Sequence, residues 1–325
     1  MSNELKSPII LFGNTRSGAT IVQKVISLHP DIVSWYEPNA LWLYADPGRI
    51  HDEFEESDAT NRVKKYIRKR FLKYQEQHGN LRIMEKTPQN LLRIPYVRSI
   101  FPEATFLFIV RDPFSFISSV EYKWQRTVTG TGIIRRLKDT PLSQLHHWVR
   151  RYIVQQVNKR ILKRKYLSIW GPRYKGIQDD LKTDDLMTVI ARQWSIPSAK
   201  AEKNMAFFED GQILRLKYED FVEDPVSDLE RIYNHCGLKV NSDVIKATKE
   251  MVKSDRTLKW KRFDPLVLAR VLPEISDEMQ RHGYEIPAEI AQSTLNLDLK
   301  DELEWPSVLS EQISGIYPSQ IKNQK

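Results

Sequence analysis

The chain has 325 residues, of which 41% are hydrophobic and 10% aromatic, so it can bury a large core and is not disordered as a whole. Its single cysteine, Cys236, excludes an intrachain disulfide and a metal site built from cysteines. The net charge of +8 at pH 7 favours an anionic partner.

Short apolar runs alternate with amphipathic segments along most of the chain. The runs that predict buried strands are residues 8–12, 81–84, 105–110 and 213–216. The segments with helical spacing are residues 21–28, 60–78, 89–100 and 225–237. This alternation is typical of a three-layer α/β fold, in which helices cover both faces of a mainly parallel central sheet.

The first strand is joined to its helix by a glycine-containing loop, Gly13–Thr20. Backbone N–H groups at such a turn, together with the helix N-terminus, favour a bound phosphate, and Arg16 adds a charged donor. The spacing of Gly13 and Gly18 fits a loop that binds nucleoside triphosphates, but Ala19 occupies the lysine position. The segment therefore predicts a phosphate-binding strand-loop-helix and disfavours an ATP-dependent kinase.

A second candidate phosphate site follows the third strand. Arg111 stands where that strand ends, at the edge where α/β proteins bind ligands. If a helix begins at Pro113, Ser119 lies about two turns along it. We therefore expect Arg111 and Ser119 to share one phosphate group.

Positive charge is concentrated between Lys123 and Lys175, where fourteen Lys or Arg residues accompany one acid. We interpret residues 124–190 as a basic helical insertion in a single domain spanning 1–287, followed by a C-terminal extension over 288–325. The insertion is either a surface for an anionic glycan, membrane or nucleic acid, or a solvated helical face. Aromatic residues that suit stacking on a sugar are Trp148, Tyr152, Tyr166, Trp170 and Tyr174.

Two observations favour a soluble, cytoplasmic protein. The longest apolar run, Ala104–Val110 if Thr105 is allowed within it, is far shorter than the ~20 residues that a membrane span needs. The first motif already begins at Gly13, which leaves no room for a cleavable signal peptide.

The two phosphate motifs together resemble those of sulfotransferases that use 3′-phosphoadenosine 5′-phosphosulfate (PAPS). In that family, one loop binds the 5′-phosphosulfate and an Arg–Ser pair eight residues apart binds the 3′-phosphate. The resemblance assigns the first role to Arg16, Ser17, Gly18, Ala19 and Thr20, and the second to Arg111 and Ser119. It also implies that Lys259 and Trp260 close over the adenosine, although Trp260 fits a core aromatic equally well. Ala19 departs from the Thr or Ser that the family usually has, which implies weaker donor binding.

The resemblance also implies the catalytic groups. Lys86 and Arg16 would neutralise the donor, and Glu37 would be the general base. Phenol and steroid sulfotransferases of the cytosol carry a histidine shortly after the lysine, which this chain lacks. The chain therefore resembles the carbohydrate and bacterial type more closely. The alternatives are a turn-capping carboxylate for Glu37 and an exposed lysine, paired with Glu85, for Lys86.

The function implied is transfer of a sulfuryl group from PAPS, as co-substrate, to an acceptor hydroxyl, with no metal. The expected acceptor is a carbohydrate, a glycolipid or another hydroxylated molecule, with or without peripheral membrane contact, and no nucleic-acid partner is expected. Two other classes are kept as alternatives: a nucleotide kinase-like enzyme with a phosphate loop, and a basic nucleic-acid-binding protein.

Overall fold

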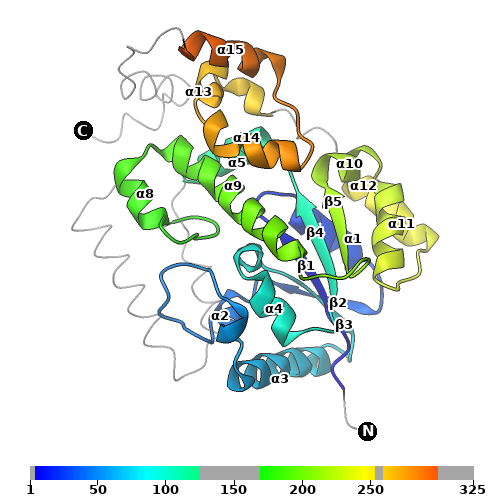
Figure 1. Ribbon diagram of the computed structural model, residues 1–325. Helices are drawn as coiled ribbons and strands as arrows, with labels where there is room; N and C mark the ends of the chain where they lie inside the picture. The colour runs from blue at the N-terminus through cyan, green and yellow to red at the C-terminus, as the bar shows by residue number, and fades with distance from the viewer. Residues whose placement is uncertain (1–3, 125–168, 253–258, 299–325) are drawn as a thin grey trace, which may run out of the picture.

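The computed structural model describes residues 4–124, 169–252 and 259–298, and these build a five-stranded sheet between two layers of helices (Figure 1). The strand order is β2-β3-β1-β4-β5, and every neighbouring pair is parallel. The strands are β1 (Ile9–Gly13), β2 (Ile32–Tyr36), β3 (Arg82–Lys86), β4 (Thr105–Val110) and β5 (Ile213–Lys217). The expected α/β fold with a parallel central sheet is confirmed.

The central strands are apolar along their whole length because both faces of the sheet are covered. In β1, Ile9 and Leu11 point into one hydrophobic core, whereas Ile10 and Phe12 point into the other. Phe12 stacks on Phe106 of β4 with ring centres 5.7 Å apart. The side-chain alternation of a single buried strand thus supplies both cores.

One core lies under the helices α1 (Ala19–Ile26), α10 (Tyr218–Glu223), α11 (Pro225–His235) and α12 (Ser242–Met251). The other face carries α2 (Asn39–Trp42), α3 (Asn61–Gln77), α4 (Ile94–Ile100), α5 (Pro113–Trp124), α9 (Leu186–Met205), α13 (Pro265–Ala269) and α14 (Leu272–Arg281). The remaining elements are α8 (Ile177–Thr183), α15 (Ala288–Asp298) and the 3-10 turns η1 (Glu56–Asp58), η2 (Pro88–Leu92) and η4 (Lys259–Arg262).

Strand β2 was not predicted from the sequence. It lies at the edge of the sheet and pairs only with β3, and only Ile32 and Trp35 of its five residues are buried. Ser34 interrupts its apolar residues, so β2 lacks the continuous apolar run that marks the central strands.

The helix expected over residues 89–100 is divided in two. Residues up to Leu92 form η2, and α4 begins at Ile94 with Pro95 in its first turn. Proline is compatible with a first turn because the amide it lacks would have no partner within the helix there.

Most of the basic insertion expected over 124–190 lies outside the described residues. Its described end belongs to the core, since Tyr174, Ile177 and Val189 pack against Leu92 of η2. In the expected C-terminal extension, α15 packs against α13, and Ile290 is fully buried. The rest of that extension lies outside the described residues.

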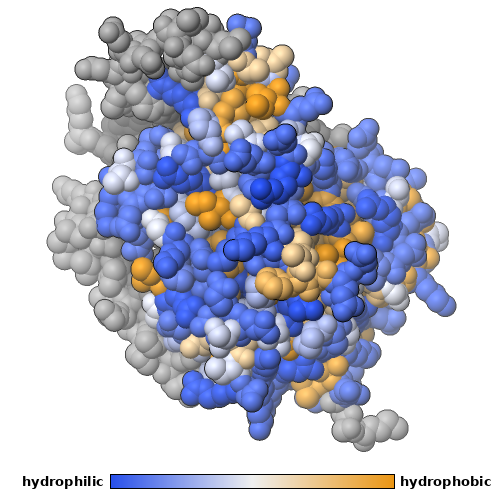
Figure 2. Space-filling model, in the orientation of Figure 1, coloured by the Kyte–Doolittle hydropathy of each residue, from blue (hydrophilic) through white to orange (hydrophobic). Residues whose placement is uncertain are grey.

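No helix in the described ranges is long and apolar enough to cross a membrane. The face shown in Figure 2 is mostly hydrophilic, with apolar groups scattered over it.

Candidate functional site

The charged candidates of the two phosphate motifs and of the catalytic pair gather at one edge of the sheet, because parallel strands present their carboxyl ends together. Glu37 follows β2, Lys86 ends β3, the loop Gly13–Thr20 follows β1, and Arg111 follows β4. The chain leaves β1 toward β2 on one side and leaves β4 toward β5 on the other. The edge between β1 and β4 is therefore a topological switch point, where open α/β sheets bind their ligands.

The loop after β1 turns sharply at Gly18, which has a φ of 89°. A Cβ atom added there would lie 2.0 Å from Cδ2 of Tyr218, so backbone and packing both require glycine. Helix α1 begins at the next residue, and the amides of Ala19 and Thr20 in its first turn have no acceptor within the helix. The predicted strand-loop-helix is present, with the N-terminus of α1 at the sheet edge.

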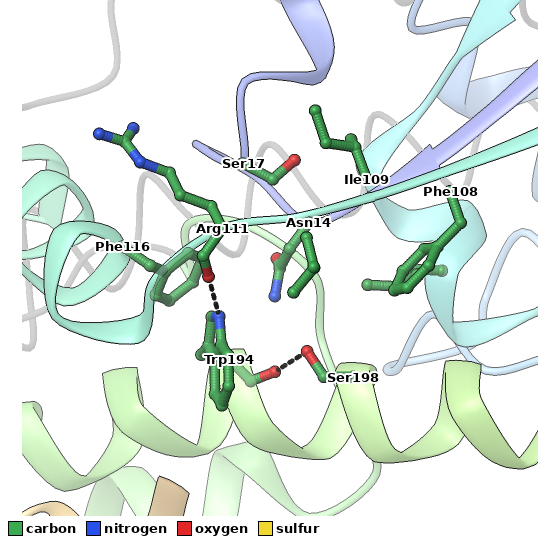
Figure 3. Close-up of a pocket in the computed structure, with 10 residues that line it drawn as sticks. Asn14, Ser17, Phe108, Ile109, Arg111, Phe116, Trp194 and Ser198 are labelled. Atoms are coloured by element: carbon green, nitrogen blue, oxygen red, sulfur yellow. Dashed lines mark hydrogen bonds between the residues drawn. The ribbon is translucent and has the colours of Figure 1, made fainter. Parts of the chain in front are cut away.

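The side chain of Ser17 points to the inside of the loop. It is buried, and the backbone N–H of Ser17 donates to the carbonyl of Asn14 at 3.2 Å. Ser17 lines a small cavity beneath the loop together with Asn14, Phe108 and Trp194 (Figure 3). Its hydroxyl therefore lies on the inner side of the loop, where it packs close to Gly13.

Arg111 and Ser119, which were expected to share one phosphate group, lie beside Arg16 of the loop. Nε of Arg16 donates to Oγ of Ser119 at 2.7 Å, and Nη1 of Arg111 donates to the carbonyl of Arg16 at 3.0 Å. The Arg111 guanidinium lies over the ring of Tyr218, 4.4 Å from its centre. Residues from the loop, β4, α5 and the start of α10 thus form one cationic cluster, which we call the Arg16–Arg111 cluster.

Helix α9 holds the backbone of this cluster in place. The indole N–H of Trp194 donates to the carbonyl of Arg111 at 2.9 Å, while the Arg111 guanidinium points away from Trp194 (Figure 3). Gln193 is fully buried, and its backbone carbonyl accepts from the side-chain amide of Asn14 at 2.7 Å. Its side chain accepts from the indole of Trp124 at 3.2 Å and donates to the carbonyl of Trp170 at 2.8 Å.

A second charged group lies on the other side of β1. Nζ of Lys86 is 2.7 Å from Oε1 of Glu37 and 4.8 Å from the centre of the Tyr36 ring. Glu37 has a φ of 49°, which ends β2 and turns the chain, and its amide donates to the carbonyl of Lys86 at 3.3 Å. The alternative of an exposed lysine paired with Glu85 is wrong, because Lys86 is buried and pairs with Glu37.

Glu85 points to the opposite face of β3, as strand alternation requires. Its carboxylate accepts from the indole N–H of Trp42 at 3.0 Å, from the side-chain amide of Asn90 at 3.1 Å and from the hydroxyl of Thr87. Complete burial raises the pKa of Glu85 to about 7, although these donors act in the opposite direction. This carboxyl group supports the turn after β3.

Two expected aromatic contacts take other positions. Trp260 is a core residue whose ring packs on Phe114, with ring centres 5.7 Å apart. A core position is the alternative that the sequence left open for Trp260. Lys259 is exposed at the start of η4. Tyr174 does not present a face to a sugar: its ring is 1% exposed, and its hydroxyl donates to Asp180 at 2.6 Å. Trp170 is partly buried, whereas Trp148, Tyr152 and Tyr166 lie outside the described residues.

Residues 8–170 and 159–242, well over half of the chain, match the model of the Sulfotransferase family. Nodulation protein NoeE of Sinorhizobium fredii is 23% identical over 134 residues, which are 36% of this chain and 32% of that protein. Protein-tyrosine sulfotransferase of Drosophila melanogaster is 30% identical over 138 residues, 38% of this chain and 27% of that protein. The matches thus span about a third or less of these relatives.

Among solved structures, a sulfotransferase domain from the curacin biosynthetic pathway is similar with a TM-score of 0.53. The alignment covers 87% of this chain and 100% of that domain at 13% sequence identity, so the similarity shows the fold alone.

Proposed function

The chain belongs to the sulfotransferase family, and on this premise we propose that it transfers a sulfuryl group from PAPS to an acceptor hydroxyl. The observation that carries the proposal is the pair of charged groups on either side of β1. The Arg16–Arg111 cluster lies toward β4, and Lys86 lies at the end of β3. A donor that carries an anionic group at each end fits two separate cationic positions with a helix N-terminus between them.

The resemblance and the geometry support a division of roles at the reacting end. Glu37 would accept the proton of the acceptor hydroxyl, since its carboxylate is partly exposed at the sheet edge. Lys86 would stabilise the negative charge that forms on the phosphate when the sulfur–oxygen bond to it breaks. The donor supplies the sulfuryl group, and the acceptor oxygen forms the new bond to sulfur. The first-turn amides of Ala19 and Thr20 and the charge of Arg16 would hold the donor.

The acceptor is proposed as a carbohydrate, a glycolipid or another hydroxylated molecule. This proposal rests on the resemblance to carbohydrate sulfotransferases, and a nodulation protein and a protein-tyrosine sulfotransferase are among the relatives. The exposed side chain of Tyr36 lies beside Glu37, and an aromatic ring in that position suits stacking against a sugar or a phenol. An ATP-dependent kinase is disfavoured because Ala19 occupies the position of the phosphate-loop lysine.

Binding of the donor product tests the proposal. We expect adenosine 3′,5′-bisphosphate to bind much more tightly than ATP in isothermal titration calorimetry. The substitution Arg111→Ala removes a charge-assisted hydrogen bond and should weaken bisphosphate binding by ~1.5–3 kcal/mol, or about 10- to 100-fold. Equal affinities of the wild-type chain for the bisphosphate and ATP would contradict the proposed donor.

A further inference from the structure

The carboxyl group of Glu85 connects the two chain segments that follow the charged pair at the ends of β2 and β3. Glu37 lies between β2 and α2, and Lys86 is the last residue of β3, before η2. Oε1 of Glu85 accepts from the indole N–H of Trp42, the last residue of α2, at 3.0 Å, and also from the hydroxyl of Thr87, which caps η2. One buried group therefore ties the turn after β2 to the turn after β3.

The position of Glu37 depends on where α2 lies relative to β3. The amide of Glu37 donates to the carbonyl of Lys86 at 3.3 Å, and its carbonyl accepts from the amide of Asn39, the first residue of α2, at 2.8 Å. Oε1 of Glu37 lies 2.7 Å from Nζ of Lys86, so a small shift of α2 along β3 changes this contact. The bond between Glu85 and Trp42 opposes such a shift.

Three donors face the carboxyl group of Glu85, and the direction of each bond is fixed by its neighbours. Nε of Arg93 can only donate, and it donates to Oδ1 of Asn90 at 2.8 Å. The side chain of Asn90 therefore turns its NH2 group to Oε2 of Glu85, 3.1 Å away. The indole N–H of Trp42 is a donor only as well. A carboxylate, which accepts at both oxygens, matches this arrangement.

These bonds are closed off from water. Glu85, Trp42, Thr87, Asn90 and Arg93 all have an exposed fraction of zero. Water cannot replace a lost partner in such a place, so breaking one of the bonds is costly. The network therefore favours the single arrangement in which all of these bonds are made.

We propose that Glu85 is a positioning residue: as a carboxylate it holds α2 to η2 and so places Glu37 against Lys86 for sulfuryl transfer. The inference rests on the proposed function and adds to it a residue that touches neither donor nor acceptor. Glu85 acts through Glu37, because its own side chain is buried on the opposite face of β3 from Lys86. Its replacement should therefore lower kcat and leave donor binding nearly unchanged.

The substitution Glu85→Gln tests this role, because it keeps the shape of the side chain and replaces one oxygen by an NH2 group. Whichever way the new amide is turned, its NH2 group faces the donor of either Asn90 or Trp42. Burial raises the pKa of Glu85 to about 7, so the assay is run at about pH 8. We expect kcat per bisphosphate-binding site to fall about tenfold or more. Calorimetry counts these sites in the folded chain and should give a bisphosphate affinity within about twofold of the wild type.

A second substitution should rescue the first. In Glu85→Gln/Asn90→Asp, the new carboxylate accepts both from the new amide and from Nε of Arg93, so the bonds of the network are all made again. The double variant has the same net charge as the wild type, and its kcat should return to within about threefold of the wild-type value. Asn90→Asp alone brings two carboxylates together and should lose activity as Glu85→Gln does. It supplies the same comparison with the double variant if Glu85→Gln does not fold.

The effect should also depend on Glu37. In the Glu37→Gln background, Glu85→Gln should change the residual kcat less than about twofold, because the group that it positions is already inactive. The control is Asp228→Asn, which replaces another buried carboxylate by an amide on α11, across the sheet, and should leave kcat per binding site unchanged.

Three results would overturn the positioning role while leaving the proposed function intact. They are wild-type kcat in Glu85→Gln, a full further loss in the Glu37→Gln background, and no recovery in a double variant that binds the bisphosphate. If the wild-type chain transfers no sulfuryl group from PAPS, the proposed function itself fails.

Discussion

Replacing Glu37 with glutamine should lower turnover about 100-fold or more while leaving donor affinity nearly unchanged. The amide keeps the size of the side chain and can still accept a hydrogen bond from Nζ of Lys86, which lies 2.7 Å from Oε1 of Glu37. It cannot take a proton from the acceptor hydroxyl. Steady-state rates at saturating donor and acceptor, together with calorimetric titration of adenosine 3′,5′-bisphosphate, measure the two quantities separately.

A purely structural role for Glu37 predicts a different result. If the carboxylate only held Lys86 in place, Glu37→Gln and Lys86→Gln would lose similar amounts of activity, and added formate would have no effect on Glu37→Ala. If Glu37 is the base, formate should restore part of the turnover of Glu37→Ala and none of that of Lys86→Gln. Wild-type turnover in Glu37→Gln would remove the residue from the mechanism.

The substitution Gly18→Ala should destabilise the fold and weaken the donor site at the same time. Its backbone lies in the left-handed region, which costs a residue with a Cβ atom ~1–2 kcal/mol. The new Cβ atom would overlap the Tyr218 ring, and overpacking typically adds ~1–3 kcal/mol. We therefore expect the free energy of unfolding to fall by ~2–5 kcal/mol in urea denaturation. Bisphosphate affinity should also decrease, because Arg111 rests on the displaced ring.

Gly176→Ala is the matched control for this prediction. Gly176 has a φ of 102° at the start of α8, but nothing lies within 4 Å of an added Cβ atom there. Gly176→Ala should therefore lower the free energy of unfolding only by the cost of placing a Cβ atom at a positive φ. The double variant Gly18→Ala/Tyr218→Ala should lose less unfolding free energy than the sum of the two single variants, because without the Tyr218 ring the new Cβ atom has nothing to overlap. Equal destabilisation by Gly18→Ala and Gly176→Ala would show that the Tyr218 contact is unimportant.

Local patterns were sufficient to predict the strands and the loop that hold the phosphate motifs, but not the edge strand that holds Glu37. Strand β4 and the loop before α1 were recognisable because a buried parallel strand is continuously apolar and a phosphate loop needs glycine at defined positions. The edge strand β2 was missed because it pairs with a single strand of the described sheet, β3, and Ser34 interrupts its apolar residues. This omission matters for the site, since the end of β2 places Glu37 against Lys86.

The contacts that orient the site could not be predicted from spacing, because they join residues far apart in the chain. Tyr218 follows strand β5, and only the fold shows that its ring packs on Gly18 and under Arg111. Trp194 reaches the carbonyl of Arg111 from a helix 83 residues away in sequence, and neither residue carries a motif for that contact. The direction of the Arg16 side chain is likewise set by Ser119, 103 residues further along the chain.

Sulfuryl transfer itself is tested most directly with PAPS that carries radioactive sulfur. The chain is incubated with this donor and a set of saccharide, glycolipid and tyrosyl-peptide acceptors, and labelled acceptor and adenosine 3′,5′-bisphosphate are both quantified. The account predicts labelling of at least one hydroxylated acceptor, with one bisphosphate formed per sulfuryl group transferred and strong loss of both in Glu37→Gln. Transfer of the terminal phosphate of ATP to these acceptors, with no transfer of label from PAPS, would contradict it.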